Sequence, residues 1–373
     1  MEITFWTSLA MLAYTYVGYP MLAWALALLR PRVVLRRRLQ PPVTIIVVVR
    51  DGEKWIDEKL SNCLTLDYPH DQLDVVLVSD GSIDRTLARA RAFESPRVEI
   101  VECPAHRGRA ACLNEAVARA SGDIIVFTDV SRRLDNSAIR NLVMNFADEK
   151  VGAVSGELVR DLDHADRPAN GTDLYWRYEK WLRNNEARFA SSVGATAAIY
   201  ALRRECYRNI PEETVLDDVL IPMNVITSGL RVVFDRNAVA SDIPSASRSR
   251  DPRRNIRAIA GNYQLLLLQP GLLNPFHNPV WLQFVSHKLL RLIVPFFLVA
   301  ALVTNFVLAT ESPAYQALLI AQLMLYIVAL LGILLPAAQR LRMIRVPSMF
   351  LLLNWFAVLG FLSFARHGRS QPW

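Results

Sequence analysis

Cysteine is scarce in this sequence, and glycine-rich phosphate-binding motifs are absent from it. Four cysteines occur among 373 residues, and none stand at the close spacing of a zinc knuckle or a redox pair. No G-x-G-x-x-G follows the first β-rich run, and no G-x-x-x-x-G-K-[ST] occurs anywhere, which argues against a dinucleotide-binding or P-loop protein. We therefore interpret the cysteines as free thiols in a reducing compartment.

Charged residues are also few. They make up 21% of the chain against 52% hydrophobic residues, and the mean hydropathy is +0.20. A soluble protein normally carries about a quarter charged residues. The apolar residues gather at the two ends, which excludes a disordered chain, a disulfide scaffold, a purely soluble enzyme and a many-helix transporter. The net charge of +7 does not indicate nucleic-acid binding, because much of it flanks the apolar segments and favours anionic lipid headgroups.

The first apolar run, residues 3–29, carries no charge. As a helix it would be roughly 40 Å long, enough to cross a bilayer. A cleaved signal peptide has its basic residues before the apolar run, whereas here an arginine cluster follows it. Because basic residues mark the cytosolic side, we predict a retained anchor over residues 1–30 with the N-terminus outside. The chain is then an integral protein of a bacterial inner membrane with a cytoplasmic catalytic domain.

The C-terminal third predicts two or three more transmembrane helices within residues 289–365. The loop before the last apolar segment is rich in arginine and favours the cytosol, but Arg366 and Arg369 in the tail 366–373 favour the cytosol as well. Two alternatives follow: the tail is translocated against the charge bias, or the last segment is re-entrant or interfacial.

Residues 256–288 are apolar, but three prolines interrupt them, so they cannot form one spanning helix. We interpret them as interfacial segments that seat the cytosolic domain on the bilayer. The alternative is a hydrophobic strip that packs on the globular core.

Residues 31–255 have the pattern of an α/β domain. Short β-branched runs at 43–49, 73–78, 98–101 and 123–128 are separated by segments of helix length, which predicts a Rossmann-like, mostly parallel sheet. Such sheets bind ligands at the carboxyl ends of their strands. Carboxylates follow these strands where glycine-rich loops would stand in a dinucleotide fold. Acidic groups there suit two tasks: pairing with a base or ribose, and holding a divalent cation against a diphosphate.

Four segments together resemble the membrane-bound family 2 glycosyltransferases, which include cellulose, chitin, hyaluronan and poly-N-acetylglucosamine synthases. They are residues 43–53, 78–86 (VSDGSIDRT), 107–114 (RGRAACLN) and 121–131 (SGDIIVFTDVS). The resemblance covers about residues 41–300. It implies a GT-A fold flanked by transmembrane helices, a UDP-sugar donor, and Mg²⁺ or Mn²⁺ as cofactor.

The resemblance also implies roles for individual residues in nucleotide-sugar binding. Asp51 and Glu53 match the first-strand nucleotide motif, and Asp80 matches the aspartate that contacts uracil. Arg109 and Asn114 match the GKxxALN motif, with arginine in place of lysine.

The metal-binding D-x-D motif is represented by Asp129 and Ser131, so the second carboxylate is replaced by a hydroxyl. The family's last motif, QxxRW, is reduced to its arginine, Arg257, with Arg254 nearby. These arginines would face the diphosphate. The missing tryptophan helps receive the polymer end in processive synthases.

Gly194, Ala195 and Thr196 resemble the family's acceptor loop, in which small side chains let a sugar hydroxyl approach the backbone. Asp217 and Asp218 resemble its acidic motif. An inverting transfer needs a carboxylate to take the acceptor proton, and Asp218 is the predicted base, with Asp217 as its orienter or as the alternative base. Adjacent aspartates also cap helices, which is the alternative reading.

Four aromatic residues crowd a predicted helix at 175–181. They suit an acceptor channel, although helical spacing of aromatics is more typical of packing.

Together these features predict a membrane-integrated inverting glycosyltransferase that extends a polysaccharide, with a homo-oligomer or a partner subunit assisting export. The alternatives are a monosaccharide transferase to a polyprenyl phosphate or sphingolipid, and a non-catalytic UDP-sugar-binding regulatory subunit.

Overall fold

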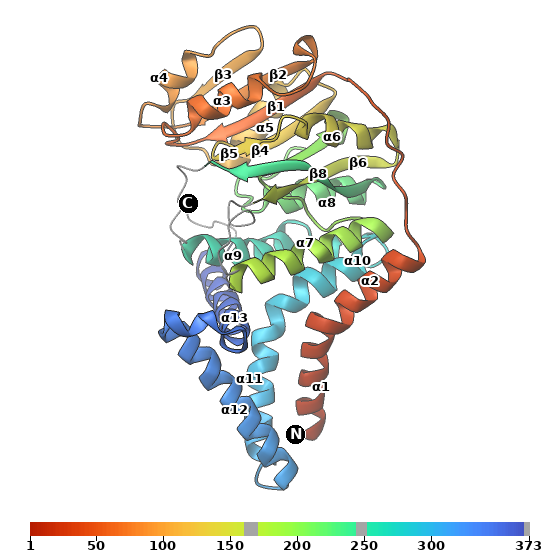
Figure 1. Ribbon diagram of the computed structural model, residues 1–373, viewed down its shortest axis with the longest axis vertical. Coiled ribbons are helices and arrows are strands. Elements are labelled where there is room, and N and C mark those ends of the chain that lie inside the picture. Colours follow the sequence, from red (N-terminus) through yellow and green to blue (C-terminus); the bar gives the residue numbers. More distant parts are fainter. Residues whose placement is uncertain (160–170, 244–251, 369–373) are drawn as a thin grey trace.

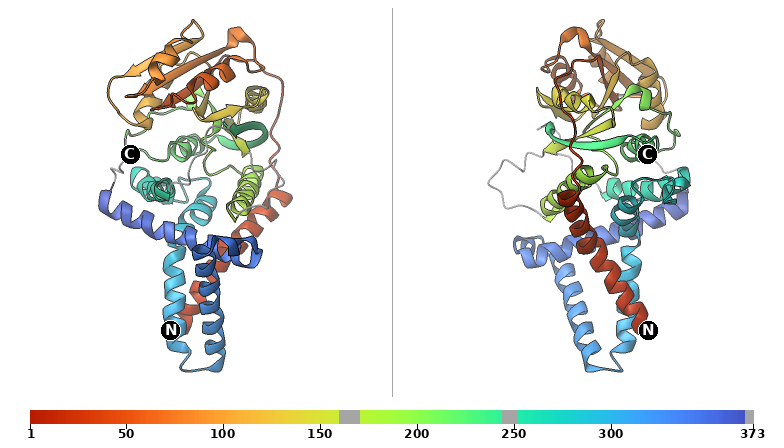
Figure 2. Two further views of the ribbon diagram at one scale, coloured as in Figure 1. Left: turned by 60° about the vertical axis from the view of Figure 1, so that its left-hand side comes forward. Right: turned by 90° about the vertical axis from the view of Figure 1, so that its right-hand side faces the viewer.

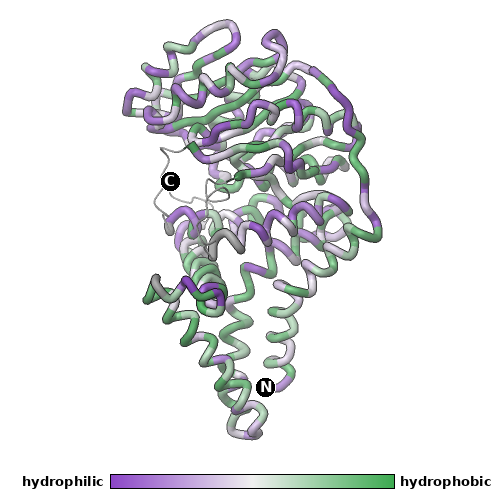
Figure 3. The backbone as a smooth tube through the Cα atoms, viewed as in Figure 1, coloured by the Kyte–Doolittle hydropathy of each residue, from purple (hydrophilic) through white to green (hydrophobic). Residues whose placement is uncertain are grey.

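The computed structural model describes residues 1–159, 171–243 and 252–368. An α/β domain stands on a stalk of long helices (Figure 1). The stalk contains α1 (Glu2–Ala13), α2 (Tyr19–Leu29), α11 (Leu290–Leu308) and α12 (Pro313–Leu334). A π-helical turn, Tyr14–Gly18, joins α1 to α2. Hydrophobic residues dominate the stalk, whereas hydrophilic residues are frequent over the α/β domain (Figure 3).

The first half of the α/β domain is built as its β-branched runs predict. Its parallel strands are β1 (Val43–Val49), β2 (Leu73–Asp80), β3 (Val98–Cys103) and β4 (Ile124–Asp129). The helices between them are α3 (Ile56–Leu64), α4 (Thr86–Arg91) and α5 (Arg109–Arg119). β1 lies between β2 and β4, and its residue Val43 pairs with Leu73 on one side and Ile124 on the other. The carboxyl ends of these three strands therefore lie at one edge.

The second half adds antiparallel strands, so the sheet is mixed, with four of the seven strand pairings in the described residues parallel, as a mostly parallel sheet requires. It contributes β5 (Arg132–Leu134), β6 (Val151–Val159), β7 (Ile199–Arg203) and β8 (Arg231–Asp242). The strand order is β3-β2-β1-β4-β7-β6-β8-β5, and β7 is antiparallel to both β4 and β6. Because Thr128 near the end of β4 pairs with Ile199 at the start of β7, the loop that precedes β7 lies at the same edge as the end of β4.

Helices cover both faces of the sheet, and each face has its own hydrophobic core. The remaining helices of the domain are α6 (Ala138–Met144), α7 (Gly171–Phe189) and α8 (Asp217–Thr227). The predicted interfacial stretch forms α9 (Pro252–Leu268), the 3-10 turn Pro270–Leu273 and α10 (Trp281–Gln283), which continues through a π-helical turn into α11. Leu265, Leu272 and Phe284 are buried in the core that includes α5 and α8. This part of the stretch packs on the globular domain.

Within the described residues, four helical segments are long and apolar enough to cross a membrane: Glu2–Leu29, Trp281–Leu308, Pro313–Leu334 and Arg342–His367. The last of these, α13 (Arg342–His367), differs in its direction. It runs across the upper ends of α11 and α12 and ends beside α9 (Figure 2). Its beginning and its end thus both lie where the stalk meets the α/β domain. Arg369 lies outside the described residues.

Candidate functional site

Arg109 joins two carboxylates that come from different parts of the chain. It is the first residue of α5, and one of its Nη atoms lies 3.0 Å from Oδ1 of Asp129, at the end of β4. Its Nε lies 3.3 Å from both carboxylate oxygens of Asp217. Burial acts to lower the pKa of Arg109, but Asp217 and Asp129 together raise it above its ordinary value. The structure thus gathers two predicted site carboxylates around the guanidinium group of a third predicted residue.

Asp218 and the predicted acceptor loop lie against each other. The backbone N–H of Ala195 donates to the backbone carbonyl of Asp218 at 2.7 Å. Gly194 has a φ of +106°, which favours glycine, and an added Cβ there would lie 3.4 Å from the same carbonyl. Thr196 is tied down as well, because its N–H donates to the hydroxyl of Ser155 at 2.9 Å. Gly194 and Ala195 are therefore held next to the first turn of α8, and Thr196 is held against β6.

The environment of Asp218 suits a proton acceptor. Burial raises the pKa of its carboxyl to about 6, and the neighbouring charge of Asp217 acts in the same direction. Lys288, Arg183 and Arg109 oppose this shift. A carboxylate with a pKa near 6 is largely ionised at neutral pH and is a stronger base than an ordinary aspartate.

The side chain of Asp80 is buried and holds the loop that precedes α5. It is 3% exposed, and its carboxylate accepts the backbone N–H groups of Arg107 at 2.7 Å and of Gly108 at 3.1 Å. Nδ1 of His106 lies 2.7 Å from the same carboxylate. Because Gly108 immediately precedes Arg109, Asp80 fixes the start of α5 and thereby the guanidinium group.

Asp51 and Glu53 tie the loop after β1 to the loop after β2. Asp51 accepts the N–H of Ile83 at 2.9 Å, and Glu53 accepts the N–H of Arg85 at 3.1 Å. Asp84 returns the contact by accepting the N–H of Glu53 at 3.1 Å. The two carboxylates of the predicted nucleotide motif thus shape this edge of the sheet.

Asn114 is a structural link in the described residues. Its amide nitrogen donates to the carbonyl of Ile210 at 2.8 Å, and its amide oxygen accepts the N–H of Ile210 and the hydroxyl of Tyr207. It therefore connects α5 to the segment that leads into α8. Arg254 and Arg257 lie in the first turns of α9, where Arg254 is exposed and Arg257 is half-buried. Burial lowers the pKa of Arg257.

Two residues at this edge were not predicted. Lys59 on α3 is fully buried, and its ammonium donates to the hydroxyl of Thr128 at 2.9 Å and to the carbonyl of Arg132 at 2.8 Å, on either side of Asp129. A lysine at a position that helical periodicity places on the apolar face of α3 is unusual, and this could have identified it from the sequence. Tyr200 is also fully buried, and burial and Asp217 raise the pKa of its hydroxyl. No sequence signal separates it from an ordinary core tyrosine.

A divalent cation would find few protein ligands here. The described residues contain no group of three or more His, Cys, Asp and Glu side chains placed to hold a metal. Asp129 is partly exposed, and Ser131 is 1% exposed with a hydroxyl that has no hydrogen-bond partner among the described residues. One carboxylate and one hydroxyl fit an ion such as Mg²⁺, which completes its shell with water and substrate phosphates.

Comparisons with known proteins identify relatives of this chain. Residues 44–210 match the family model described as Glycosyl transferase family 2. Beta-monoglucosyldiacylglycerol synthase from Synechocystis sp. is 30% identical over 118 residues, which are 31% of this chain and 25% of that protein. Poly-beta-1,6-N-acetyl-D-glucosamine synthase from Staphylococcus aureus is 29% identical over 116 residues, which are 31% of this chain and 28% of that protein. The chain thus spans less than a third of the length of these curated relatives.

A solved structure extends the likeness to the helices of the stalk. The mannosyltransferase PcManGT from Pyrobaculum calidifontis, in complex with GDP-Man and Mn²⁺, superposes with a TM-score of 0.72 at 23% identity. The superposition covers 95% of this chain and 97% of that chain. At this identity the likeness shows the fold. Residues 44–210 therefore carry a Glycosyl transferase family 2 domain, and the chain has the GT-A fold that its motifs predict.

Proposed function

We propose that this protein transfers a sugar from a nucleotide diphosphate sugar to a hydroxyl group of a lipid acceptor at the cytoplasmic membrane surface. The observation that carries the proposal is the junction at Arg109, which holds Asp129 and Asp217 together beside Asp218 and the 194–196 loop. UDP is the nucleotide that the sequence motifs predict. The similar mannosyltransferase holds GDP-Man, so both nucleotides belong in the test.

The reaction needs one proton acceptor and one group that receives the leaving charge. Asp218 takes the proton of the acceptor hydroxyl while that oxygen bonds to the anomeric carbon of the donor sugar. The bond from this carbon to the diphosphate breaks at the same time, and the configuration is inverted because the two oxygens lie on opposite faces. Arg109 stabilises the charge of the departing diphosphate.

Asp129 and Ser131 are the residues that would hold a divalent cation. Bound there, Mg²⁺ or Mn²⁺ would neutralise the diphosphate of the donor. The buried, unpartnered hydroxyl of Ser131 and the partly exposed carboxylate of Asp129 support this assignment. The solved mannosyltransferase contains Mn²⁺, which supports it further.

We further propose three membrane spans and one interfacial helix. The spans are α1 with α2, then α11, then α12, and α13 is the interfacial helix because it runs across the upper ends of α11 and α12 (Figure 2). Arg342 and Arg366, near those ends, then share the cytosolic side with the arginines after α2. This topology resolves the charge conflict of the last apolar segment without translocating the tail.

The lipid acceptor, rather than a polysaccharide, is supported by the size of the stalk. α1 packs directly on α11 through Phe5, Ala301 and Leu308. Helices in direct contact stand 8–10 Å apart, so three spans are too few to enclose a channel for a sugar polymer. The polysaccharide acceptor favoured by the sequence motifs remains a prediction, and product length separates it from the lipid acceptor.

The test uses the full-length protein in lipid nanodiscs with radiolabelled UDP- and GDP-sugars and a bacterial lipid extract. We expect a single labelled product that partitions into organic solvent, together with release of the nucleotide. Asp218→Asn should abolish both, whereas Asp71→Asn, an exposed control, should not. A ladder of water-soluble products would refute the lipid acceptor. Donor binding without turnover by the wild type would favour the regulatory alternative.

A further inference from the structure

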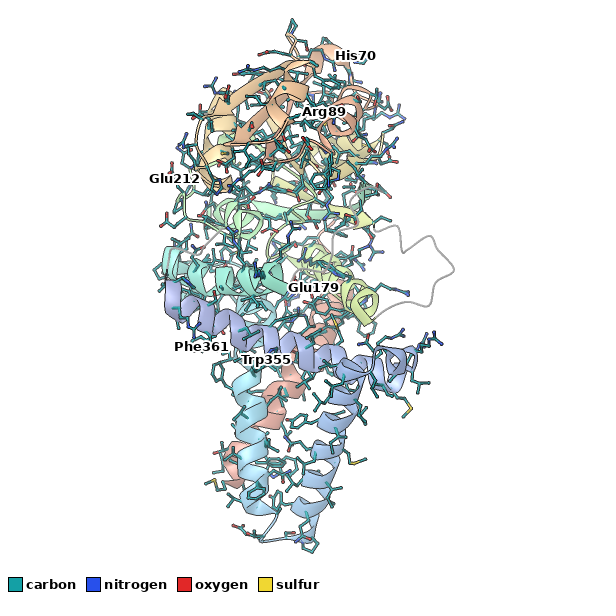
Figure 4. The ribbon with its side chains drawn as sticks, turned by 90° about the vertical axis from the view of Figure 1, so that its left-hand side faces the viewer. His70, Arg89, Glu179, Glu212, Trp355 and Phe361 are labelled. Atoms are coloured by element: carbon teal, nitrogen blue, oxygen red, sulfur yellow. The ribbon has the colours of Figure 1, made fainter. Side chains whose placement is uncertain are left out.

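A cavity of about 430 Å³ lies where α7, α11 and α13 meet, between the α/β domain and the stalk. Figure 4 shows Glu179, which lines this cavity, on α7 at that level, with Trp355 and Phe361 on α13 below it. Apolar side chains of α13, among them Val346, Met349 and Phe350, line the cavity from one direction. The cavity is therefore apolar on the membrane side and polar on the side of the domain.

The polar wall is built around a buried carboxylate. Glu179 is 5% exposed and lies 2.7 Å from Nε2 of His287, 2.7 Å from an Nη atom of Arg291 and 3.9 Å from Nε of Arg183. Although burial acts against the ionised form, Arg291 and His287 hold the pKa of Glu179 well below its ordinary value. On its other side, His287 contacts Glu186 at 2.9 Å. His287 and Arg291 are thus fixed in place.

The wall carries more positive than negative charge. Among the residues that line the cavity, Glu179 is the one carboxylate, against the basic side chains of Arg183, Lys288 and Arg291. Within the described part of the chain, no carboxylate lies within ion-pair distance of Lys288, and Nε and one Nη of Arg291 have no hydrogen-bond partner. Buried donors without partners favour a ligand that supplies acceptor oxygens.

We propose that this cavity binds the phosphate of the acceptor lipid, with Lys288 and Arg291 donating to its oxygens and the lipid chain lying along α13. A phosphate accepts hydrogen bonds from several cationic donors at once, which a neutral headgroup does not. The aromatic rings of Tyr175 and Trp176, which also line the cavity, suit the boundary between headgroup and chain.

The position of the cavity relative to the catalytic carboxylate supports the same assignment. Lys288 and Arg183 both act electrostatically on Asp218. Both cations also line the cavity, so a hydroxyl beside the bound phosphate, such as a glycerol hydroxyl of phosphatidylglycerol, would lie on the side of the cavity that these cations share with Asp218. This inference rests on the proposed function for the identity of the acceptor, but the binding itself is measurable without turnover.

The experiment measures lipid binding to full-length protein in detergent by native mass spectrometry. The probes are phosphatidylglycerol, a polyprenyl phosphate, diacylglycerol and inorganic phosphate. We expect both phosphate lipids to bind more tightly than diacylglycerol, and Lys288→Gln to weaken them about tenfold, which is the loss of one charge-assisted hydrogen bond. Arg177→Gln, an exposed change on α7 outside the cavity, should leave binding unchanged.

Three outcomes would overturn the proposal. They are equal binding of diacylglycerol and the phosphate lipids, unchanged binding in Lys288→Gln, and inorganic phosphate binding as tightly as the lipids. Met349→Trp fills the apolar side without touching a charge and should also weaken both lipids, which guards against a folding defect in one variant. Asp218→Asn should bind lipid as the wild type does, so a failure of the proposed transfer reaction remains separate from a failure of this site.

Discussion

Replacing Arg109 by lysine tests whether one guanidinium group must hold two carboxylates at once. In the structure Nε of Arg109 lies 3.3 Å from the carboxylate of Asp217, and an Nη atom lies 3.0 Å from that of Asp129. A lysine has a single charged nitrogen and can keep only one of these contacts at full strength. Arg109→Lys keeps the positive charge, so its effect reports only the loss of the forked guanidinium geometry that reaches both carboxylates.

The expected loss follows from the number of contacts removed. A hydrogen bond to a charged group contributes about 1.5–3 kcal/mol, and Arg109 is 20% exposed, so solvent weakens this only modestly. One lost contact should lower kcat/KM by about 10- to 100-fold, since each 1.4 kcal/mol is a factor of about ten. The assay is nucleotide release by the full-length protein in nanodiscs.

Arg119→Lys is the matched control, because Arg119 lies on the same helix and also serves two carboxylates, Glu99 and Glu115. Its side chain is 44% exposed, so the same change should cost well under tenfold. If Arg109→Lys retains more than a third of the wild-type kcat/KM, the fork is not needed and the reasoning fails.

Four further outcomes follow from the same site. Asp218→Asn should lower kcat by about 10²–10⁴-fold with the donor KM little changed; a residual rate above a tenth would assign the base elsewhere. Because Asp218 accepts a proton only when ionised, kcat should fall as the pH drops through about 6, and Lys288→Gln should move this limb to higher pH; an unmoved limb counts against the coupling. EDTA should reduce turnover and Mn²⁺ restore it, and Asp129→Asn should raise the Mn²⁺ concentration required; full activity in EDTA would exclude the metal. Gly194→Ala should lower kcat and the melting temperature, since alanine at φ +106° is strained; an unchanged variant would show a loop free to adjust.

The first half of the sheet was predictable because its information is local. The run at 43–49 is β-branched throughout, and the strand observed is Val43–Val49. The direction of β7 was not predictable in this way. Its sequence, Ile199–Arg203, is an ordinary buried strand, and only its pairing with β4 and β6 makes it antiparallel. Strand direction depends on which neighbours pair, which a single local pattern does not contain.

For the site as well, part was predictable from the sequence and part was not. The motif order indicated that Asp129, Asp217 and Arg109 belong to one site, and the structure places them in contact. The motif order did not indicate that the side chains of Asp80 and Asn114 form hydrogen bonds with backbone groups. Those backbone groups belong to loops, and the placement of these loops depends on the whole fold. A motif therefore marks a position at the site more reliably than it marks which atoms the side chain contacts.

The hydroxyl of Tyr19, in the N-terminal span, donates to Glu186, the carboxylate that also contacts His287. Through Glu186 and His287, the N-terminal helix is thereby connected by hydrogen bonds to the wall of the proposed lipid-binding cavity. A shortened version of the protein that begins at Val43 would lose this donor and leave a buried carboxylate short of a partner. If the proposed lipid site is correct, such a version should still hold a nucleotide yet fail to recognise its lipid, because the N-terminal helix supports that site through Glu186.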